Sequence, residues 1–155
     1  METSFLADLH PKVVHFPVAL LTTYSFLEII GIAFNKEFLS KTALLILCLG
    51  VVSAFFAVLT GNQAATEFNF INEASRTLFS EHQNYATYLL WFSVILCSLR
   101  IYIFIKKKLY GMIKYVFIIF ALLMLFFVYR TWMIGGELVK KYRIGTEVNN
   151  QIEPE

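Results

Sequence analysis

Four long apolar segments constrain the fold of this chain more than any other feature. They occupy residues 13–33, 42–60, 85–105 and 112–132 and carry few charged side chains. An α-helix of about 20 mostly apolar residues crosses the roughly 30 Å hydrocarbon core of a bilayer, and it satisfies its own backbone hydrogen bonds there. We therefore predict an all-α integral membrane protein in which four helices cross the bilayer and form one bundle.

The composition supports this assignment and excludes several functions. Of the 155 residues, 58% are apolar and 15% are charged, whereas ordinary soluble domains have roughly 45–50% and about 25%. The net charge of +2 is too small to indicate a nucleic-acid partner. Cys48 and Cys97 lie within apolar segments and form no CxxC pair, which excludes covalent c-type haem attachment and a thiolate zinc site. The sequence has no Ser-His-Asp set or phosphate-binding loop, so a non-catalytic subunit is favoured over an enzyme.

The longest connection between spans, residues 61–84, has an apolar pattern of its own. Phe68, Ile71, Ala74 and Leu78 recur at helical spacing, which is typical of an amphipathic helix. We predict a short interfacial helix that leads into the third span. An irregular polar loop is the alternative.

Prolines and glycines mark the expected bends and ends of the helices. Pro17 lies inside the first span and removes one backbone hydrogen bond, so a mild kink is expected there. Gly135 and Gly136 follow the fourth span and are expected to end that helix. These boundaries divide the chain into a transmembrane domain, residues 1–134, and a polar C-terminal tail, residues 135–155.

Basic residues predict how the bundle is oriented in the membrane. With four spans, both termini share one side, and the two short connections lie on the other. Lys106, Lys107 and Lys108 stand in the connection between the third and fourth spans, where the positive-inside rule places them in the cytoplasm. We expect a bacterial inner-membrane protein with both termini outside.

The three histidines fall on the outer side of the predicted bundle. His10 and His15 flank the start of the first span, and His82 lies near the start of the third. Imidazole is the commonest protein metal ligand, and a haem in a helix bundle needs ligands from two facing helices. His15 and His82 are therefore the predicted axial ligands of a noncovalent haem b. His10 and Arg130 are expected to hydrogen-bond its propionates. The alternative for Arg130 is an interfacial anchor within the aromatic belt.

A row of small residues on the second span is a second component of this predicted site. Gly50, Ala54, Ala57 and Gly61 are spaced four, three and four residues apart, so they share one helical face. Such a row lets a porphyrin approach the backbone, with Ala54 and Ala57 against its apolar edge. The alternative is a seam where two membrane helices pack.

Glu28 is a single acidic residue deep within a span. Intramembrane carboxylates are rare and are usually paired or functional, so a role in proton or quinone chemistry is one interpretation. The other is a protonated side chain, or one that extends toward Lys36 at the interface.

Residues 9–21, LHPKVVHFPVALL, resemble the opening motif of an uncharacterised family of small bacterial four-helix membrane proteins. The resemblance extends over residues 9–146 and includes Thr60-Gly61, His82, Arg100 and the segment GGELV at 135–139. Some members of that family are joined to c-type cytochrome-like domains, which implies a place in electron transfer.

The leading hypothesis is therefore a b-type cytochrome-like electron-transfer subunit that binds haem on the outer side of the membrane. Its expected partners are the lipid bilayer, a membrane or c-type cytochrome redox partner, and an oligomer or larger complex. Two alternatives remain open. One is a cofactor-free structural or assembly subunit, and the other is a copper or zinc protein that uses His15 and His82 with His10.

Overall fold

The computed structural model describes residues 5–66, 72–109 and 111–142, all of them in helices or in short connections between helices. The helices are α1 (Phe5–Val13), α2 (His15–Ala33), α3 (Glu37–Ala65), α4 (Glu73–Ile105) and α5 (Ile113–Tyr142). Four stretches are long and apolar enough to cross a membrane: Leu9–Ala33, which joins the end of α1 to α2, and the whole of α3, α4 and α5. The predicted four-span, all-α architecture is confirmed.

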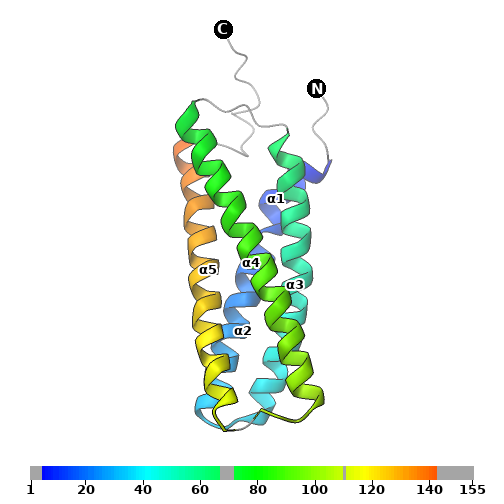
Figure 1. The fold of residues 1–155 in the computed structure, drawn as a ribbon. Helices are drawn as coiled ribbons and strands as arrows, with labels where there is room; N and C mark the ends of the chain where they lie inside the picture. Colours follow the sequence, from blue (N-terminus) through cyan, green and yellow to red (C-terminus); the bar gives the residue numbers. More distant parts are fainter. Residues whose placement is uncertain (1–4, 67–71, 110, 143–155) are drawn as a thin grey trace.

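The four spans form a bundle in which α2 and α4 each pack between α3 and α5 (Figure 1). α1 packs mainly on α3. One end of the bundle, here called the terminal end, holds α1, the end of α3, the start of α4 and the end of α5. The opposite end, here called the loop end, holds the end of α2, the start of α3, the end of α4 and the start of α5.

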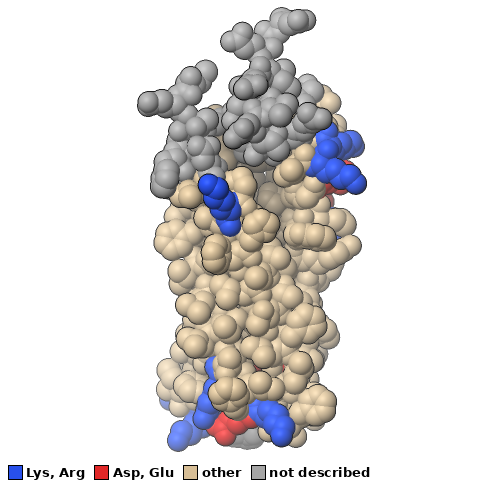
Figure 2. All heavy atoms as spheres, turned by 180° about the vertical axis from the view of Figure 1, so that it is seen from behind, with Lys and Arg blue, Asp and Glu red and all other residues tan. Residues whose placement is uncertain are grey.

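Apolar side chains line both the inside and the outside of this bundle. Leu21, Leu47, Leu96 and Met124 are fully buried between the helices. Large apolar side chains also cover the outer surface, and Figure 2 shows that lysines, arginines and acidic residues gather toward the two ends. An uncharged, apolar exterior between two charged ends matches a hydrocarbon layer.

The sequence predicted a mild kink near Pro17, and the helix is interrupted nearby, between α1 and α2 at Val14. Pro17 has no N–H to donate to the carbonyl of Val13, four residues earlier. The Val14 N–H still donates to the carbonyl of His10 at 3.1 Å, so a helical hydrogen bond continues across the interruption and Leu9–Ala33 remains one span.

The predicted short interfacial helix does not form as a separate element, because its second half is the start of α4. Asn72 caps α4, accepting from the backbone N–H of Ser75 at 2.9 Å, while the Ser75 hydroxyl accepts from the Asn72 backbone at 3.2 Å. From this cap one helix of 33 residues runs to Ile105, which is about 50 Å at about 1.5 Å per residue. Phe68 and Ile71 lie outside the described residues.

The predicted end of the fourth helix at Gly135 and Gly136 is wrong. α5 continues through both glycines to Tyr142. Leu138 and Tyr142 are buried against Phe79 of α4, and this packing stabilises the last turns more than the glycines weaken them. The bundle therefore extends to residue 142 instead of ending at residue 134.

Candidate functional site

Two polar clusters lie inside this apolar bundle, one at each end. The first contains His10 and His82 at the terminal end. The second contains Glu28, Ser40 and Arg100 near the loop end. A polar group in a membrane interior must find a partner or bind a ligand, so both clusters are candidate sites.

His10 is held in place by Thr60 of α3. The Thr60 hydroxyl donates to the carbonyl of Phe56 at 2.9 Å, so its oxygen is available to accept from His10 Nδ1, 3.1 Å away. A neutral imidazole carries only one N–H. When Nδ1 donates to Thr60, Nε2 of His10 keeps a free lone pair.

His82 of α4 is half-buried and hydrogen-bonds the backbone of Thr131 in α5. Its Nδ1 is buried and has no hydrogen-bond partner among the described residues. Thus Thr60 and the Ala57 backbone orient the His10 ring, and the Thr131 backbone orients the His82 ring. Histidines that ligate metals are held in this way, because the second ring nitrogen is fixed by an outer hydrogen bond.

Each imidazole rests against a glycine in the middle of a helix. A Cβ atom on Gly61 would lie 2.8 Å from Cε1 of His10, and a Cβ atom on Gly135 would lie 2.9 Å from Cε1 of His82. Any larger residue would push the ring away, so glycine is required at both positions for close approach of the ring to the backbone. This contact explains Gly135 where the sequence pattern had indicated a helix end.

The two histidines lie at one membrane level. Gly61, His82 and Gly135 are 24, 23 and 22 residues from the loop ends of α3, α4 and α5, or about 33–36 Å at about 1.5 Å per residue. His10 touches Gly61 and is close enough to His82 for a coulombic interaction. With about 30 Å of hydrocarbon, this level coincides with one edge of the bilayer.

His15 does not join this cluster, which departs from the predicted pairing of His15 with His82. Its side chain is exposed on the outside of α2. Five residues separate His10 from His15, and five residues of a helix correspond to a rotation of about 140° from the starting face. Only one of the two can face the interior, and the bundle places His10 there.

The remaining predicted site residues divide between packing and surface roles. Gly50 packs beneath Leu21, where a Cβ atom would lie 2.6 Å from Leu21 Cδ2, so this part of the row is a helix-packing seam. Ala54 and Ala57 are also buried. Arg130 forms an ion pair with Glu81 at 3.1 Å and lies over the ring of Tyr85, beside the histidine cluster.

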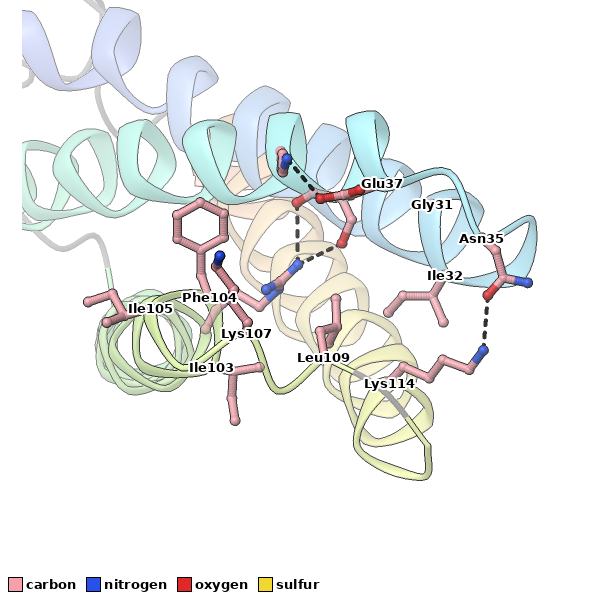
Figure 3. Close-up of a pocket in the computed structure, with 13 residues that line it drawn as sticks. Gly31, Ile32, Asn35, Glu37, Ile103, Phe104, Ile105, Lys107, Leu109 and Lys114 are labelled. Atoms are coloured by element: carbon pink, nitrogen blue, oxygen red, sulfur yellow. Dashed lines mark hydrogen bonds and ion pairs between the residues drawn. The ribbon is translucent and has the colours of Figure 1, made fainter.

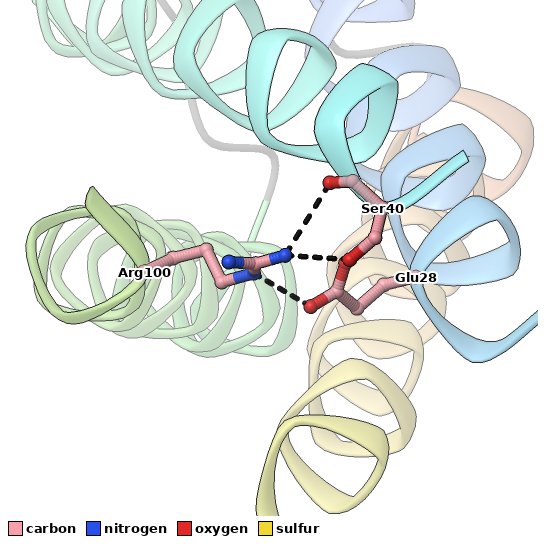
Figure 4. Close-up of polar contacts among 3 residues, drawn as sticks. All are labelled: Glu28, Ser40 and Arg100. Atoms are coloured by element: carbon pink, nitrogen blue, oxygen red, sulfur yellow. Dashed lines mark hydrogen bonds and ion pairs between the residues drawn. The ribbon is translucent and has the colours of Figure 1, made fainter. Parts of the chain in front are cut away.

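The second cluster joins three helices near the loop end, as Figure 4 shows. Nε of Arg100 in α4 donates to Oε1 of Glu28 in α2 at 2.7 Å. Nη2 of Arg100 donates to the hydroxyl of Ser40 in α3 at 2.6 Å, and that hydroxyl lies 3.3 Å from the second oxygen of Glu28. The Arg100 guanidinium also lies over the ring of Phe117 in α5.

This cluster explains how a carboxylate is retained inside a span. Glu28 is 0% exposed and Arg100 is 2% exposed, so the charges compensate each other away from water. The predicted extension of Glu28 toward Lys36 is therefore wrong. One feature of the sequence could have indicated the pairing of Glu28 with Arg100. Both are charged residues inside an apolar span, and each lies about five residues from the loop end of its helix.

One family model matches this chain over residues 7–148, and its description is "predicted membrane protein (DUF2231)". No curated protein and no solved structure matches the chain.

Proposed function

Since the chain belongs to the DUF2231 family of predicted membrane proteins, we propose that it is a b-type cytochrome-like electron-transfer subunit that holds haem b noncovalently between His10 and His82. This assignment replaces His15 with His10 as the first axial ligand. It keeps His82 as the second.

One observation carries the proposal: two half-buried imidazoles from different helices lie near each other at one level of the bundle, each against a helical glycine. A haem supplies four nitrogen ligands itself, so it needs only two from the protein. Among the described residues, no group of three or more His, Cys, Asp or Glu could hold a metal ion. A pair of neighbouring histidines therefore favours haem over a copper or zinc site, which takes three or four protein ligands.

The residues present fit this cofactor. The buried Nδ1 of His82 has no hydrogen-bond partner among the described residues, and His10 keeps a free lone pair on Nε2 when Thr60 accepts from its Nδ1. Gly61 and Gly135 allow the two imidazole rings to lie directly against the helix backbones at this level. Arg130, at the same end, is the cation that would meet the propionates.

Bound haem iron would supply one-electron chemistry, and the protein residues position it. Thr60 and the Thr131 backbone orient the two imidazoles. Arg130 at the terminal end would pair with the haem propionates, because burying two carboxylates in hydrocarbon is very unfavourable. A c-type cytochrome or another membrane redox protein is the partner class that fits a haem at the bilayer edge.

The orientation proposed from the sequence is part of the same account. Lys106, Lys107 and Lys108 stand at the loop end, so the positive-inside rule places the loop end in the bacterial cytoplasm and the histidine cluster outside. A cysteine introduced near Lys107 tests this orientation. In intact cells it should escape an impermeant thiol reagent, and labelling would reverse the assignment.

The histidines are tested by single changes in protein purified from haem-replete cells. His10→Ala and His82→Ala are each expected to abolish the low-spin absorption spectrum, because each removes one axial ligand. His15→Ala is the matched control, since that side chain lies on the outer surface, and it should leave the spectrum unchanged. Loss of the spectrum in His15→Ala but not in His10→Ala would return the assignment to His15. Absence of haem from the wild-type protein would indicate a cofactor-free structural subunit.

A further inference from the structure

A cavity of about 620 Å³ lies at the loop end, on the opposite side of the bilayer from the histidine cluster. It opens among α2, α3, α4 and the start of α5, and Figure 3 shows the side chains that line it. The volume is in the range of small-molecule sites.

The inner part of this cavity is lined by the guanidinium of Arg100, whose position is fixed by hydrogen bonds. Arg100 lines the cavity although it is 2% exposed, and it is held by Glu28 and Ser40. A buried guanidinium held on one side is preorganised to meet an anion on the other.

The rim of the cavity is basic. Lys41, Lys107 and Lys114 line it together with one acidic residue, Glu37. Lys41 pairs with Glu37 at 2.8 Å, and Lys114 hydrogen-bonds Asn35 at 3.0 Å. Counting Arg100 and its partner Glu28, four cationic groups face two anionic ones, which leaves a net charge of +2.

Lys107 is the most informative residue of the rim, because its side chain has no hydrogen bond or ion pair among the described residues and its backbone is unusual. Its φ is +51°, a left-handed conformation in which glycine is strongly favoured. The surrounding bonds are those of a Schellman helix end: the N–H of Lys107 donates to Phe104 at 3.1 Å and that of Lys108 to Ile103 at 3.0 Å. A lysine thus stands at a position that favours glycine, and such backbone outliers point to function.

The walls between this basic rim and the lipid are apolar. Ile103, Phe104, Ile105 and Leu109 line the cavity, and Phe104 and Ile105 are exposed on the outer surface of the bundle. A ligand with an anionic head and an apolar tail could thus place its head on the basic residues while its tail stays in the bilayer.

We propose that this cavity binds the phosphate of an acidic phospholipid, with Arg100 and Lys107 as the principal cations. The ligand chemistry is a phosphate group at a basic membrane pocket between helices. A soluble phosphate compound has the same head chemistry but gains nothing from the apolar walls, so the lipid is the source that the cavity favours.

The test uses the full chain in detergent, with lipid binding measured by native mass spectrometry. Phosphatidylglycerol and phosphatidylcholine with identical acyl chains are the probes. Phosphatidylglycerol should bind preferentially, and Lys107→Gly should weaken its binding about fivefold, as expected for one basic residue near a phosphate. Because glycine suits the left-handed position, this variant should fold at least as stably as the wild type.

Lys106→Gln is the matched control, since it removes one positive charge from the adjacent residue, which does not line the cavity. It should leave phosphatidylglycerol binding unchanged, whereas Lys107→Gln should weaken it. Equal binding of the two lipids, or an equal loss in Lys106→Gln and Lys107→Gln, would overturn the proposal, because either result would show only general surface attraction. Displacement of the lipid by millimolar inorganic phosphate would overturn the choice of a lipid and assign the site to a soluble phosphate.

Discussion

Removing either charge of the buried pair between Glu28 and Arg100 should destabilise the bundle strongly. Arg100→Met eliminates two short hydrogen bonds, at 2.7 Å to Glu28 and at 2.6 Å to the Ser40 hydroxyl. The third contact, to the Ser40 carbonyl, is long at 3.4 Å and adds little. Hydrogen bonds to charged groups contribute about 1.5–3 kcal/mol each, so the free energy of unfolding should fall by about 3–6 kcal/mol. This agrees with the roughly 3–5 kcal/mol that follows from removing one partner of a buried pair.

The double variant separates a true pair from two independent losses. Glu28→Gln leaves the Arg100 guanidinium without its counter-charge, so this single change should also destabilise the protein by about 3 kcal/mol or more. Glu28→Gln combined with Arg100→Met leaves no uncompensated charge. The combined loss should therefore be smaller than the sum of the two single losses by at least about 2 kcal/mol.

Unfolding in detergent can be followed with a thiol-reactive dye, because Cys97 is buried and Cys48 is partly buried in the folded bundle, and both thiols become more reactive when it opens. The exposed ion pair between Glu37 and Lys41 is the matched control, and its double-variant cycle should show less than about 0.5 kcal/mol of coupling. If the losses in the free energy of unfolding caused by Glu28→Gln and Arg100→Met were additive within about 0.5 kcal/mol, as in the control cycle, the buried pair would not hold the helices together.

Three further predictions follow from the interior. Gly135→Ala should destabilise the protein and disturb His82, because the new Cβ atom would lie 2.9 Å from the His82 ring. Gly136→Ala has open space around it and should stabilise α5 by about 0.5–1 kcal/mol. Equal effects of the two variants in thermal unfolding would contradict the close packing of His82 on Gly135. Tyr24→Phe should stabilise the bundle by about 1 kcal/mol, because the buried Tyr24 hydroxyl has no hydrogen-bond partner among the described residues and a buried polar group without a hydrogen bond is unfavourable. A variant less stable than the wild type would show that the hydroxyl does form a hydrogen bond. Cys48 and Cys97, whose Sγ atoms lie 3.5 Å apart, should form an intramolecular disulfide of about 2.05 Å under a membrane-permeant oxidant; mass spectrometry that finds both thiols intact would contradict their placement.

The four spans could be predicted from the sequence, because a bilayer requires about 20 apolar residues in each and almost nothing else satisfies that requirement. The ends of the helices could not be predicted in the same way. α3 begins at Glu37 and α5 continues to Tyr142, since a helix in the headgroup region can carry charged residues while it packs on its neighbours. Apolar length indicates where the hydrocarbon lies, not where the helix stops.

The contacts between helices depend on rotation about each helix axis, which the apolar pattern leaves open when both faces are hydrophobic. His15 was chosen over His10 as the predicted ligand for this reason, and only the packing of α1 on α3 shows that His10 is the one that faces the interior. Membrane depth was the more informative signal: Glu28 and Arg100 lie about five residues from the loop end of their helices. Gly135 was misassigned because the sequence alone does not distinguish a glycine that ends a helix from a glycine that makes room for a neighbouring side-chain ring.

The haem content of the purified wild-type chain tests the central claim most directly. Protein from haem-replete cells, assayed by the pyridine haemochrome method, should contain one haem b per chain and show the sharp bands of a low-spin, bis-histidine iron. Protein that is fully folded by its thermal unfolding but contains no haem, and takes up none when haem is added, would contradict the account.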